Sequence, residues 1–378
     1  MRIYLDNNAT TQLDKEVFEV MARCYLEDYG NASSIHSMGV RASKMLEDAR
    51  RTLGHLLKVP ADRLFFTSSA TESLNWAIRS AARTQAHLGD TIVVGEIEHS
   101  AVLSTVKDVS KLHKLKIRTL PVNKRSEYLM DELEKLLDES VIVVALMSAN
   151  NETGTLQDLK TAAGLIKEKA PSALFLVDAV QSFGKAPVRI AEWDPDFLAL
   201  SAHKFHGPKG VGLLYVKEGT PLVPLITGGG QEGGMRSGTQ NVPGAVGMAK
   251  AAEKALKIFE ATVTKMRAQQ RRIADAVKAL GGVVITPLDN ALPNTLQISF
   301  PGIAGQHLVN ALSSEEIYVS THSACGSKKR GSHVLKAMKL DPLIERGAIR
   351  ISTSRYTTDE EIDRFLEVLE RVVSIFRL

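Results

Sequence analysis

The chain has 378 residues, of which 44% are hydrophobic and 24% are charged. This composition is ordinary for a soluble globular protein and excludes a disordered, collagen-like or coiled-coil chain. At about 150 residues per domain the length predicts roughly 2.5 domains, meaning two domains or one large domain with an appendage. The net charge of +4 is too small, over so large a surface, to indicate nucleic acid binding by itself.

The chain contains two cysteines, Cys24 and Cys325. They exclude a disulfide framework and a zinc site built on paired Cys-x-x-Cys motifs, and they suit a reducing cytoplasm. The N-terminal sequence MRIYLDNNATT lacks the apolar region of a signal peptide, and the apolar runs fall short of the ~20 residues needed to cross a bilayer. We therefore expect a soluble cytoplasmic protein with no membrane association and no metal site.

The first two thirds of the chain alternate short β-type runs with longer helical patterns. The expected helices cover residues 37–57, 71–87, 100–113 and 159–169. The expected strands cover residues 64–67, 91–94, 116–120, 141–146, 174–178, 197–200 and 211–216. Strands rich in Val, Ile and Leu that alternate with helices are typical of a largely parallel sheet covered on both faces. No helix separates the last two strands, which indicates an antiparallel addition.

The sequence pattern changes after Thr227, where a glycine-rich stretch is followed by one long helical pattern from about residue 244 to 280. The last helix is expected to begin at Thr358, which forms a capping box with Glu361. Strands are expected near residues 295–300, 317–320 and 349–352. We therefore expect a large domain of residues 13–255 and a smaller α+β domain of residues 1–12 and 256–378.

Lys204 lies in the segment SAHKFHGPKG, directly after an expected strand. Ligands of α/β proteins bind at the carboxyl ends of strands, and a lysine there can form a Schiff base in a pocket that lowers its pKa. The ordinary alternative is a solvated loop lysine. Compared with a lysine at an arbitrary position, a lysine directly after a strand is more often a functional residue.

Asp178 closes the apolar strand of LFLVDAVQS, and Gln181 follows three residues later. An acid at the mouth of a buried strand can hold a pyridine nitrogen protonated, which makes a pyridoxal ring an electron sink. The alternative is a helix N-cap with Gln181 as its capping-box partner. Together with Lys204, Asp178 favours pyridoxal 5′-phosphate (PLP), because this cofactor needs both an imine lysine and a ring acid.

Three further segments carry candidate side chains. In TSSATES, backbone N–H groups at a helix start and the hydroxyl of Thr71 suit a phosphate, although similar residues cap ordinary helices. His99 ends TIVVGEIEH at another expected strand end; a lone histidine is more often structural.

Cys325 lies in a polar loop near Lys328, Lys329 and Arg330, which favours an exposed thiolate, whereas Cys24 lies in a helical run and is expected to pack as a hydrophobe.

The glycines from Gly228 to Gly233 match G-x-G-x-x-G, with Glu253 at a suitable distance. The match comes late in the chain, and Glu253 lies inside a helical pattern rather than at a strand end. We therefore expect no dinucleotide site.

A series of motifs, which follow one another in order along nearly the whole chain, shows which known family the chain resembles. They are YLDNNATT, TSSATES, EHSAV, ANNETGT, VDAVQS, SAHKFHGPKG, GGGQEGGMRSGTQNVPG, HSACGS and IRISTSRYTTDEEID. The chain resembles cysteine desulfurases of the NifS and IscS type, in class V of the fold-type I PLP enzymes. The resemblance implies a large domain with a mostly parallel seven-stranded sheet sandwiched by helices, plus a smaller α+β domain that carries the catalytic cysteine loop.

The resemblance also implies roles for individual residues. Lys204 carries PLP as a Schiff base, Asp178 pairs with the pyridine nitrogen, and His99 stacks on the ring and takes part in catalysis. The remaining cofactor contacts are implied for Gln181 at the phenolic oxygen, for Ala70, Thr71, Ser201 and His203 at the phosphate, and for Thr239 from the other subunit of a homodimer. The substrate carboxylate is implied to bind between Asn150 and Arg355, since guanidinium binds carboxylates in a bidentate manner.

The implied reaction removes sulfur from L-cysteine, giving L-alanine and a persulfide on Cys325. The persulfide then passes to an acceptor, such as a scaffold protein for iron–sulfur cluster assembly or a tRNA thiolation partner. The chain departs from the family at Gly233, where relatives carry Arg, at Ser69, where Gly is common, and in a basic segment after Cys325 that is one residue shorter. The alternatives are selenocysteine lyase activity, transamination or lyase chemistry on another amino acid, and a binding protein whose residues 328–330 hold a polyanion.

Overall fold

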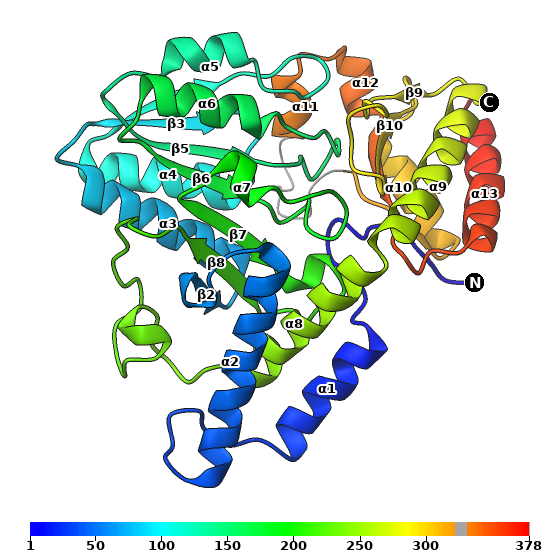
Figure 1. Cartoon of the computed structure of the whole chain (residues 1–378). Helices are drawn as coiled ribbons and strands as arrows, with labels where there is room; N and C mark the ends of the chain where they lie inside the picture. Colours follow the sequence, from blue (N-terminus) through cyan, green and yellow to red (C-terminus); the bar gives the residue numbers. More distant parts are fainter. Residues whose placement is uncertain (322–330, 378) are drawn as a thin grey trace.

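The computed structural model describes residues 1–321 and 331–377 (Figure 1). Two features predicted from the sequence, the sulfur-accepting Cys325 and the basic residues 328–330, lie outside the described residues.

A seven-stranded sheet in the order β2-β8-β7-β6-β5-β3-β4 forms the centre of the larger part of the molecule. Its strands are β2 (Leu64–Thr67), β3 (Thr91–Gly95), β4 (Lys116–Leu120), β5 (Val141–Met147), β6 (Leu174–Asp178), β7 (Phe197–Ser201) and β8 (Gly212–Val216). Strands β3 to β7 pair in parallel, whereas β8 is antiparallel to both β7 and β2. The mostly parallel sheet and its antiparallel last strand are therefore confirmed.

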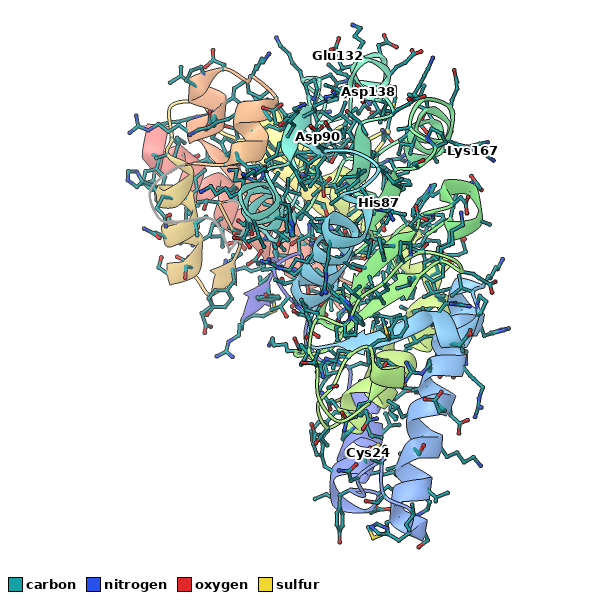
Figure 2. The ribbon with its side chains drawn as sticks, turned by 90° about the vertical axis from the view of Figure 1, so that its left-hand side faces the viewer. Cys24, His87, Asp90, Glu132, Asp138 and Lys167 are labelled. Atoms are coloured by element: carbon teal, nitrogen blue, oxygen red, sulfur yellow. The ribbon has the colours of Figure 1, made fainter. Side chains whose placement is uncertain are left out.

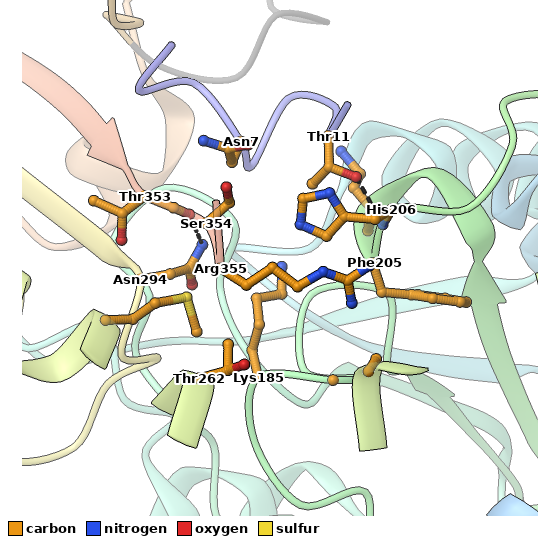
Figure 3. A pocket seen from close by; sticks show the side chains of 14 residues that line it. Asn7, Thr11, Lys185, Phe205, His206, Thr262, Asn294, Thr353, Ser354 and Arg355 are labelled. Carbon is orange, nitrogen blue, oxygen red and sulfur yellow. Dashed lines mark hydrogen bonds between the residues drawn. The ribbon is translucent and has the colours of Figure 1, made fainter. Parts of the chain in front are cut away.

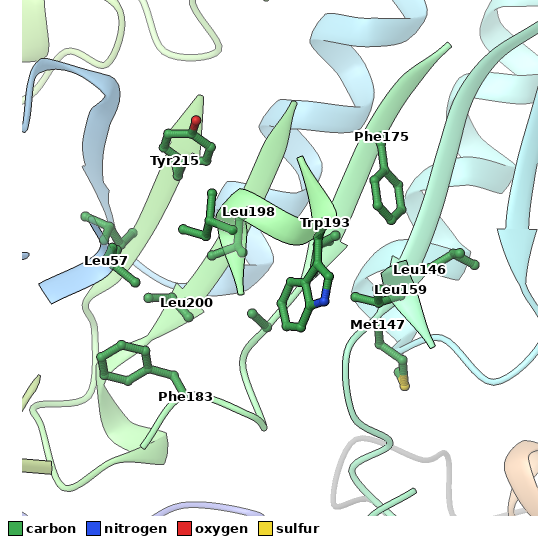
Figure 4. Packing of buried hydrophobic residues seen from close by; sticks show 14 of the residues in the cluster. Leu57, Leu146, Met147, Leu159, Phe175, Phe183, Trp193, Leu198, Leu200 and Tyr215 are labelled. Atoms are coloured by element: carbon green, nitrogen blue, oxygen red, sulfur yellow. The ribbon is translucent and has the colours of Figure 1, made fainter. Parts of the chain in front are cut away.

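Helices cover both faces of this sheet (Figure 1). They are α2 (Ser37–Leu57), α3 (Ala70–Gln85), α4 (Ser100–His113), α5 (Met130–Leu136), α6 (Leu159–Lys169), α7 (Ile190–Trp193) and α8 (Val242–Lys257). Successive side chains of a strand point to opposite faces, so Val144 and Leu146 join one hydrophobic cluster while Val143 and Ala145 join the other. Figure 4 shows the first cluster, in which Trp193 lies among side chains of the sheet.

The C-terminal third forms a smaller unit around a three-stranded antiparallel sheet. Its elements are α9 (Phe259–Ala279), β9 (Val283–Val284), β10 (Thr295–Ser299), α10 (Gly305–Ser314), β11 (Ile317–Tyr318), α11 (His333–Ala337), α12 (Pro342–Arg346), β12 (Ala348–Ser352) and α13 (Asp359–Arg377). The N-terminal strand β1 (Ile3–Tyr4) pairs in parallel with β11, and Ile3 and Leu5 belong to the hydrophobic core of this unit. We propose that residues 1–12 and 256–378 form a small domain beside a large domain of residues 13–255.

The long helix expected from residue 244 to 280 is in fact two helices. The backbone leaves helical geometry at Ile258 (φ −108°, ψ 18°), between α8 and α9. Ala252 of α8 packs into the core of the large sheet, whereas Ile273 and Val277 of α9 pack into the core of the C-terminal unit. Because of this break, one continuous apolar pattern contributes side chains to two hydrophobic cores, one in each part of the molecule. The capping box at Thr358 is confirmed, because Thr358 and Glu361 exchange side-chain to backbone hydrogen bonds.

Helix α1 (Lys15–Leu26) projects from the body beside α2 (Figure 1). Cys24 on this helix is 1% exposed, and its thiol donates to Val20 O at 3.2 Å, which confirms that it packs as a hydrophobe. Figure 2 shows Cys24 at one end of the molecule, and Asp90 and Asp138, which precede β3 and β5, toward the other. Within residues 1–321 and 331–377, no helix combines the length and hydropathy needed to cross a membrane.

Candidate active site

A cavity of about 190 Å³ lies at the carboxyl ends of β5, β6 and β7, facing the N-terminus of α3. The structure brings most of the predicted cofactor residues to its walls, namely Ala70, Thr71, His99, Asp178, Gln181, Ser201, His203 and Lys204. Parallel strands bring their carboxyl ends to one edge of the sheet, which explains why residues far apart in the sequence meet here.

Lys204 ends a short 3₁₀ helix (Ala202–Lys204) that follows β7 directly. Its Nζ donates to Asn8 O at 2.6 Å and to Ala9 O at 2.8 Å. The amine therefore spans from the sheet to the N-terminal segment. Two backbone carbonyls accept hydrogen bonds from this amine beside the cavity.

Asp178 is the last residue of β6, and its carboxylate is buried. Its Oδ1 accepts a hydrogen bond from Val180 N at 3.0 Å. Burial raises the pKa of Asp178, while that backbone hydrogen bond and the electrostatic interactions with His99 and Lys204 act in the opposite direction. A protonated ring nitrogen placed here would offset the burial of the carboxylate.

The helix-cap alternative for Asp178 and Gln181 is wrong, because residues 180–185 form turns instead of a helix. Gln181 does not reach back to the backbone of Asp178. Its Nε2 donates to Asn8 O at 3.0 Å, and its Oε1 accepts from Lys185 Nζ at 2.8 Å. The Gln181 amide therefore belongs to the cavity wall.

His99 is the N-cap of α4, and its Nδ1 accepts from Ala101 N at 3.1 Å. Burial lowers the pKa of His99, with a smaller opposing contribution from Asp178. The ring is therefore neutral at pH 7, and because Nδ1 accepts a hydrogen bond, its proton lies on Nε2. A neutral imidazole with this tautomer can stack on a flat ring and donate a hydrogen bond from its Nε2–H.

The part of the cavity wall formed by the start of α3 suits an anion. Ala70 and Thr71 begin the 16-residue helix α3, and Ser69 caps it by accepting from Glu72 N. Free backbone N–H groups at a helix N-terminus attract phosphate. His203 faces this region and contacts Thr10 Oγ1 at 3.1 Å; burial lowers its pKa to about 4, so it acts as a neutral hydrogen-bonding group.

Sequence reasoning used the N-terminal DNNATT segment as a family motif but assigned it no role in the site. The structure lays it across the cavity, where Asn8 O accepts from both Lys204 and Gln181. Asn8 also ties the site to the C-terminal unit through Thr295 Oγ1 at 2.8 Å and Ser352 Oγ at 2.9 Å. The available signal was a run of small polar residues directly after a short apolar strand.

Arg350 and Glu98 are two further residues that sequence reasoning missed. Arg350 lines the cavity, is 1% exposed, and pairs with Asp6 at 2.6 Å. Glu98 is buried next to His99, and its Oε1 accepts from Tyr128 OH and Met147 N. Burial raises the pKa of Glu98, while the hydrogen bonds from Tyr128 and Met147 act in the opposite direction.

Arg355 lies at a second, smaller cavity of about 30 Å³, which Lys204 and Lys185 also line (Figure 3). Its Nη2 pairs with Asp14 Oδ2 at 2.7 Å. Its buried Nε has no hydrogen-bond partner among the described residues. The two cavities therefore meet at Lys204, with Asp178 on one side and Arg355 on the other.

Two predicted residues do not line either cavity. The Asn150 side chain is buried in its own turn, where Oδ1 accepts from Glu152 N and Thr153 N, while its neighbour Asn151 lines the larger cavity. Thr239 is exposed on the segment after the glycine-rich stretch. Their roles stay predictions. In the part of the chain that the structure describes, no cluster of His, Cys, Asp and Glu is arranged to hold a metal.

Comparison with known proteins gives the family of this site. Residues 3–365 match the family described as aminotransferase class-V. The chain is 38% identical over 384 residues to the cysteine desulfurase IscS of Dictyoglomus turgidum, with 99% of this chain and 95% of that protein covered. It is 41% identical over 380 residues to a cysteine desulfurase of Cereibacter sphaeroides, with 100% and 97% covered.

A solved structure of a NifS-like protein superposes with a TM-score of 0.95 at 45% identity, covering 99% of this chain and all of that one (100%). The likeness thus includes the sheet, the C-terminal unit and the cavity between them. The chain belongs to the class-V aminotransferase family and, within it, to the cysteine desulfurases.

Proposed function

We propose that this chain is a PLP-dependent cysteine desulfurase that converts L-cysteine into L-alanine and leaves the sulfur as a persulfide on Cys325. One observation carries the proposal: a single cavity holds Lys204, the buried Asp178 and the first turn of α3. These supply an amine, an acid and a phosphate site, which are the three groups that PLP requires. Cysteine desulfurases of this family depend on PLP.

The residues present fit that cofactor. Burial of Asp178 raises its pKa, and a cationic ring nitrogen is the partner that would keep this carboxyl ionised. Ala70, Thr71, Ser201 and His203 line the same cavity and can bind the phosphate. Gln181, which lines the cavity, is proposed to donate its amide N–H to the phenolic oxygen. A bound PLP supplies an electron sink conjugated with the amino group of the substrate.

Lys204 and His99 are proposed to move the protons of the reaction. Lys204 Nζ would hold the cofactor, and the same amine, beside the bound substrate, would take up the proton of the α-carbon. His99 lines the same cavity and is proposed as a second group that moves a proton: its neutral imidazole would take the proton up and return it from the imidazolium. The surrounding burial keeps bulk water from competing for these transfers.

Arg355 is proposed to bind the carboxylate of L-cysteine. It is buried, one of its guanidinium nitrogens lacks a partner among the described residues, and the cavity it lines is shared with Lys204. A guanidinium binds a carboxylate through two parallel hydrogen bonds, which would fix the substrate's α-carbon near the lysine. Asn150 is proposed as the second partner, from the turn whose next residue, Asn151, lines the larger cavity.

In the sulfur step, the thiolate of Cys325 attacks the sulfur of L-cysteine. The S–S bond forms as the Cβ–S bond breaks, and Cβ takes a proton, so that L-alanine leaves and Cys325 carries one additional sulfur atom. A single-turnover reaction tests this proposal. We expect one equivalent of L-alanine and a mass gain of one sulfur atom on the peptide that contains Cys325.

The Cys325→Ala variant separates this function from the alternatives. We expect it to bind PLP normally and to form no persulfide. A keto acid produced from L-cysteine at an unchanged rate by this variant would instead support transamination. If Cys325→Ala released selenium from L-selenocysteine and sulfur from L-cysteine at equal rates, this would support a lyase that does not use the thiol of Cys325.

We further propose that the enzyme is a homodimer. Four large apolar side chains on and after α1, at Phe18, Tyr25, Leu26 and Tyr29, are each 58–76% exposed in a single chain. Covering apolar groups of this size is a usual reason for association. Thr239, which is exposed, is proposed to reach the phosphate of the other subunit. Analytical ultracentrifugation should give a dimer, and Thr239→Ala should weaken PLP binding without changing the oligomeric state.

The destination of the sulfur is proposed from the family alone. We propose a cytoplasmic enzyme that passes its persulfide to a protein scaffold for iron–sulfur assembly or to a tRNA thiolation partner. Radioactive sulfur loaded onto Cys325 should move to a reduced scaffold protein on mixing. If the label stays on the enzyme with every acceptor offered, the proposal of protein-to-protein transfer fails.

A further inference from the structure

Lys185 is a buried lysine that the mechanism above does not use. It follows β6 in the turns that also hold Gln181, is 7% exposed, and borders the smaller cavity (Figure 3). Its Nζ donates to Gln181 Oε1 at 2.8 Å. This contact joins it to a residue of the cofactor cavity.

The surroundings of Lys185 are unfavourable for a charge. Within the described part of the chain, the charged groups that act on it are Lys204 and Arg350, which are both cations. Burial, followed by these two charges, lowers the pKa of Lys185 to about 7. A buried amine costs stability unless its hydrogen bonds compensate. A leucine or methionine would fill the same space at lower cost, so the hydrogen bond to Gln181 is the feature that distinguishes lysine here.

That hydrogen bond decides which way the Gln181 amide faces. An ammonium group has donors and no acceptor, so it must meet the amide oxygen of Gln181 and not its nitrogen. The amide nitrogen consequently lies at the other end, where one N–H donates to Asn8 O at 3.0 Å. A second N–H remains on the same nitrogen, and Gln181 lines the cavity next to Lys204. A neutral lysine can accept as well as donate, but Asn8 O can only accept, and it keeps the amide nitrogen of Gln181 at the same end after Lys185 has titrated.

We propose that Lys185 is a positioning residue that fixes the amide of Gln181 with its nitrogen toward the cofactor. The inference rests on the proposed function, in which Gln181 donates to the phenolic oxygen of PLP. A flipped amide would place its oxygen against that phenolic oxygen, and the two would repel each other. Lys185 therefore acts through Gln181 and does not touch the cofactor itself.

The loaded enzyme provides a readout that is independent of turnover. The pKa of Lys204 Nζ in its bond to PLP appears as the pH midpoint of the visible absorption. A donor to the phenolic oxygen stabilises that oxygen most after Lys204 Nζ has lost its proton, so losing the donor raises the midpoint. We expect Lys185→Met, which keeps length and apolar volume, to raise the midpoint by about one pH unit, the size of one hydrogen bond.

A double-mutant cycle separates positioning from a direct charge effect. Gln181→Leu should raise the midpoint by a similar amount, and adding Lys185→Met to Gln181→Leu should change it no further. If Lys185→Met shifts the midpoint equally in the Gln181→Leu background, Lys185 acts by its charge on Lys204 and the inference is overturned. An unchanged midpoint in Lys185→Met alone overturns it as well.

Two controls complete the experiment. Lys167→Met removes a lysine distant from the cavity and should leave the midpoint unchanged, which rules out an effect of net charge (Figure 2). Lys185→Gln keeps an N–H donor and guards against loss of folding; its midpoint should lie between wild type and Lys185→Met, and a midpoint equal to or above that of Lys185→Met contradicts the inference. If Gln181→Leu itself has no effect, the assigned role of Gln181 in the proposed function fails, and not merely the role of Lys185.

Discussion

The larger of the two cavities that meet at Lys204 is walled mainly by the ends of adjacent strands, whereas the smaller one draws on the N-terminal segment, α9 and the residues after β12. The first contains the buried acid Asp178 and suits a cationic ring nitrogen. The second is lined by Arg355, Lys185 and Lys204, with no acid among its described lining residues. Sheet topology therefore brings most of the cofactor side together, with Asn8 and Arg350 added from distant segments, while the substrate side depends mainly on contacts between distant parts of the chain.

Asp14 shows how those distant contacts work. It caps α1 by accepting from Glu16 N, and it also pairs with Arg355 at 2.7 Å and with Lys254 at 2.9 Å. Tyr356 OH donates to the same carboxylate. One buried carboxylate thus joins the start of α1 and the end of α8 to the segment that carries Arg355.

The largest effect is expected on the residue that both cavities share. Lys204→Ala should bind PLP without forming a covalent bond and should lose activity by about 10³-fold or more, because the amine both carries the cofactor and moves a proton. The visible spectrum and the rate of L-alanine formation measure this. A Lys204→Ala protein with the wild-type absorption band would place the covalent bond elsewhere.

A second change affects the cofactor side alone. Asp178→Asn keeps the shape and the hydrogen bond from Val180 N but removes the charge that pairs with the ring nitrogen. We expect the rate to fall by about 10²-fold or more, because preorganised charge is usually the largest contribution to catalysis. The KM for L-cysteine should change little, since the carboxylate site is separate. A large rise in KM with an unchanged kcat would show that Asp178 acts on substrate binding. The assignment of one cavity to the cofactor and the other to the substrate carboxylate would then be wrong.

A third change affects the substrate side alone. Arg355→Lys keeps a positive charge near Asp14 but loses the two-pronged geometry. The KM for L-cysteine is predicted to rise by about 10-fold or more, with the pH midpoint of the visible absorption unchanged. Steady-state kinetics and a spectral titration give both values. An unchanged KM would remove Arg355 from the carboxylate site.

The smallest effect is expected at Asp14, and it depends on pH. Burial alone would raise the pKa of the Asp14 carboxyl, but hydrogen bonds from Tyr356 and Lys254 and the charge of Arg355 hold it well below its usual range. A depressed pKa means that the native contacts of Asp14 stabilise the fold above pH of about 3.9 and lose this effect as the pH falls further. Asp14→Asn keeps the helix cap and should cost about 2 kcal/mol of unfolding free energy at pH 7. Denaturant titrations should show that this difference shrinks below pH 4; a constant difference contradicts the charge network.

The sequence predicted most of the fold because the strands that build it are short, apolar and separated by clear helical patterns. Asp178, His99 and Lys204 were found for the same reason, since each follows or ends such a strand. The roles of Asn8, Arg350 and Asp14 were missed because they depend on long-range contacts, such as Arg350 with Asp6, that leave no local periodicity. The break at Ile258 was missed because an apolar pattern does not reveal which of two cores each half contacts.

Two lysines at this site could react with an aldehyde: Lys204, between the cavities, and Lys185, whose pKa is lowered to about 7. Reducing the PLP-loaded protein with borohydride fixes the cofactor to whichever amine holds it, and peptide mass spectrometry then locates the label. We expect one pyridoxyl group per chain, on Lys204, with Lys185 unmodified. A label on Lys185, or no label on either lysine, would contradict the assignment of the cavity on which the proposed function rests.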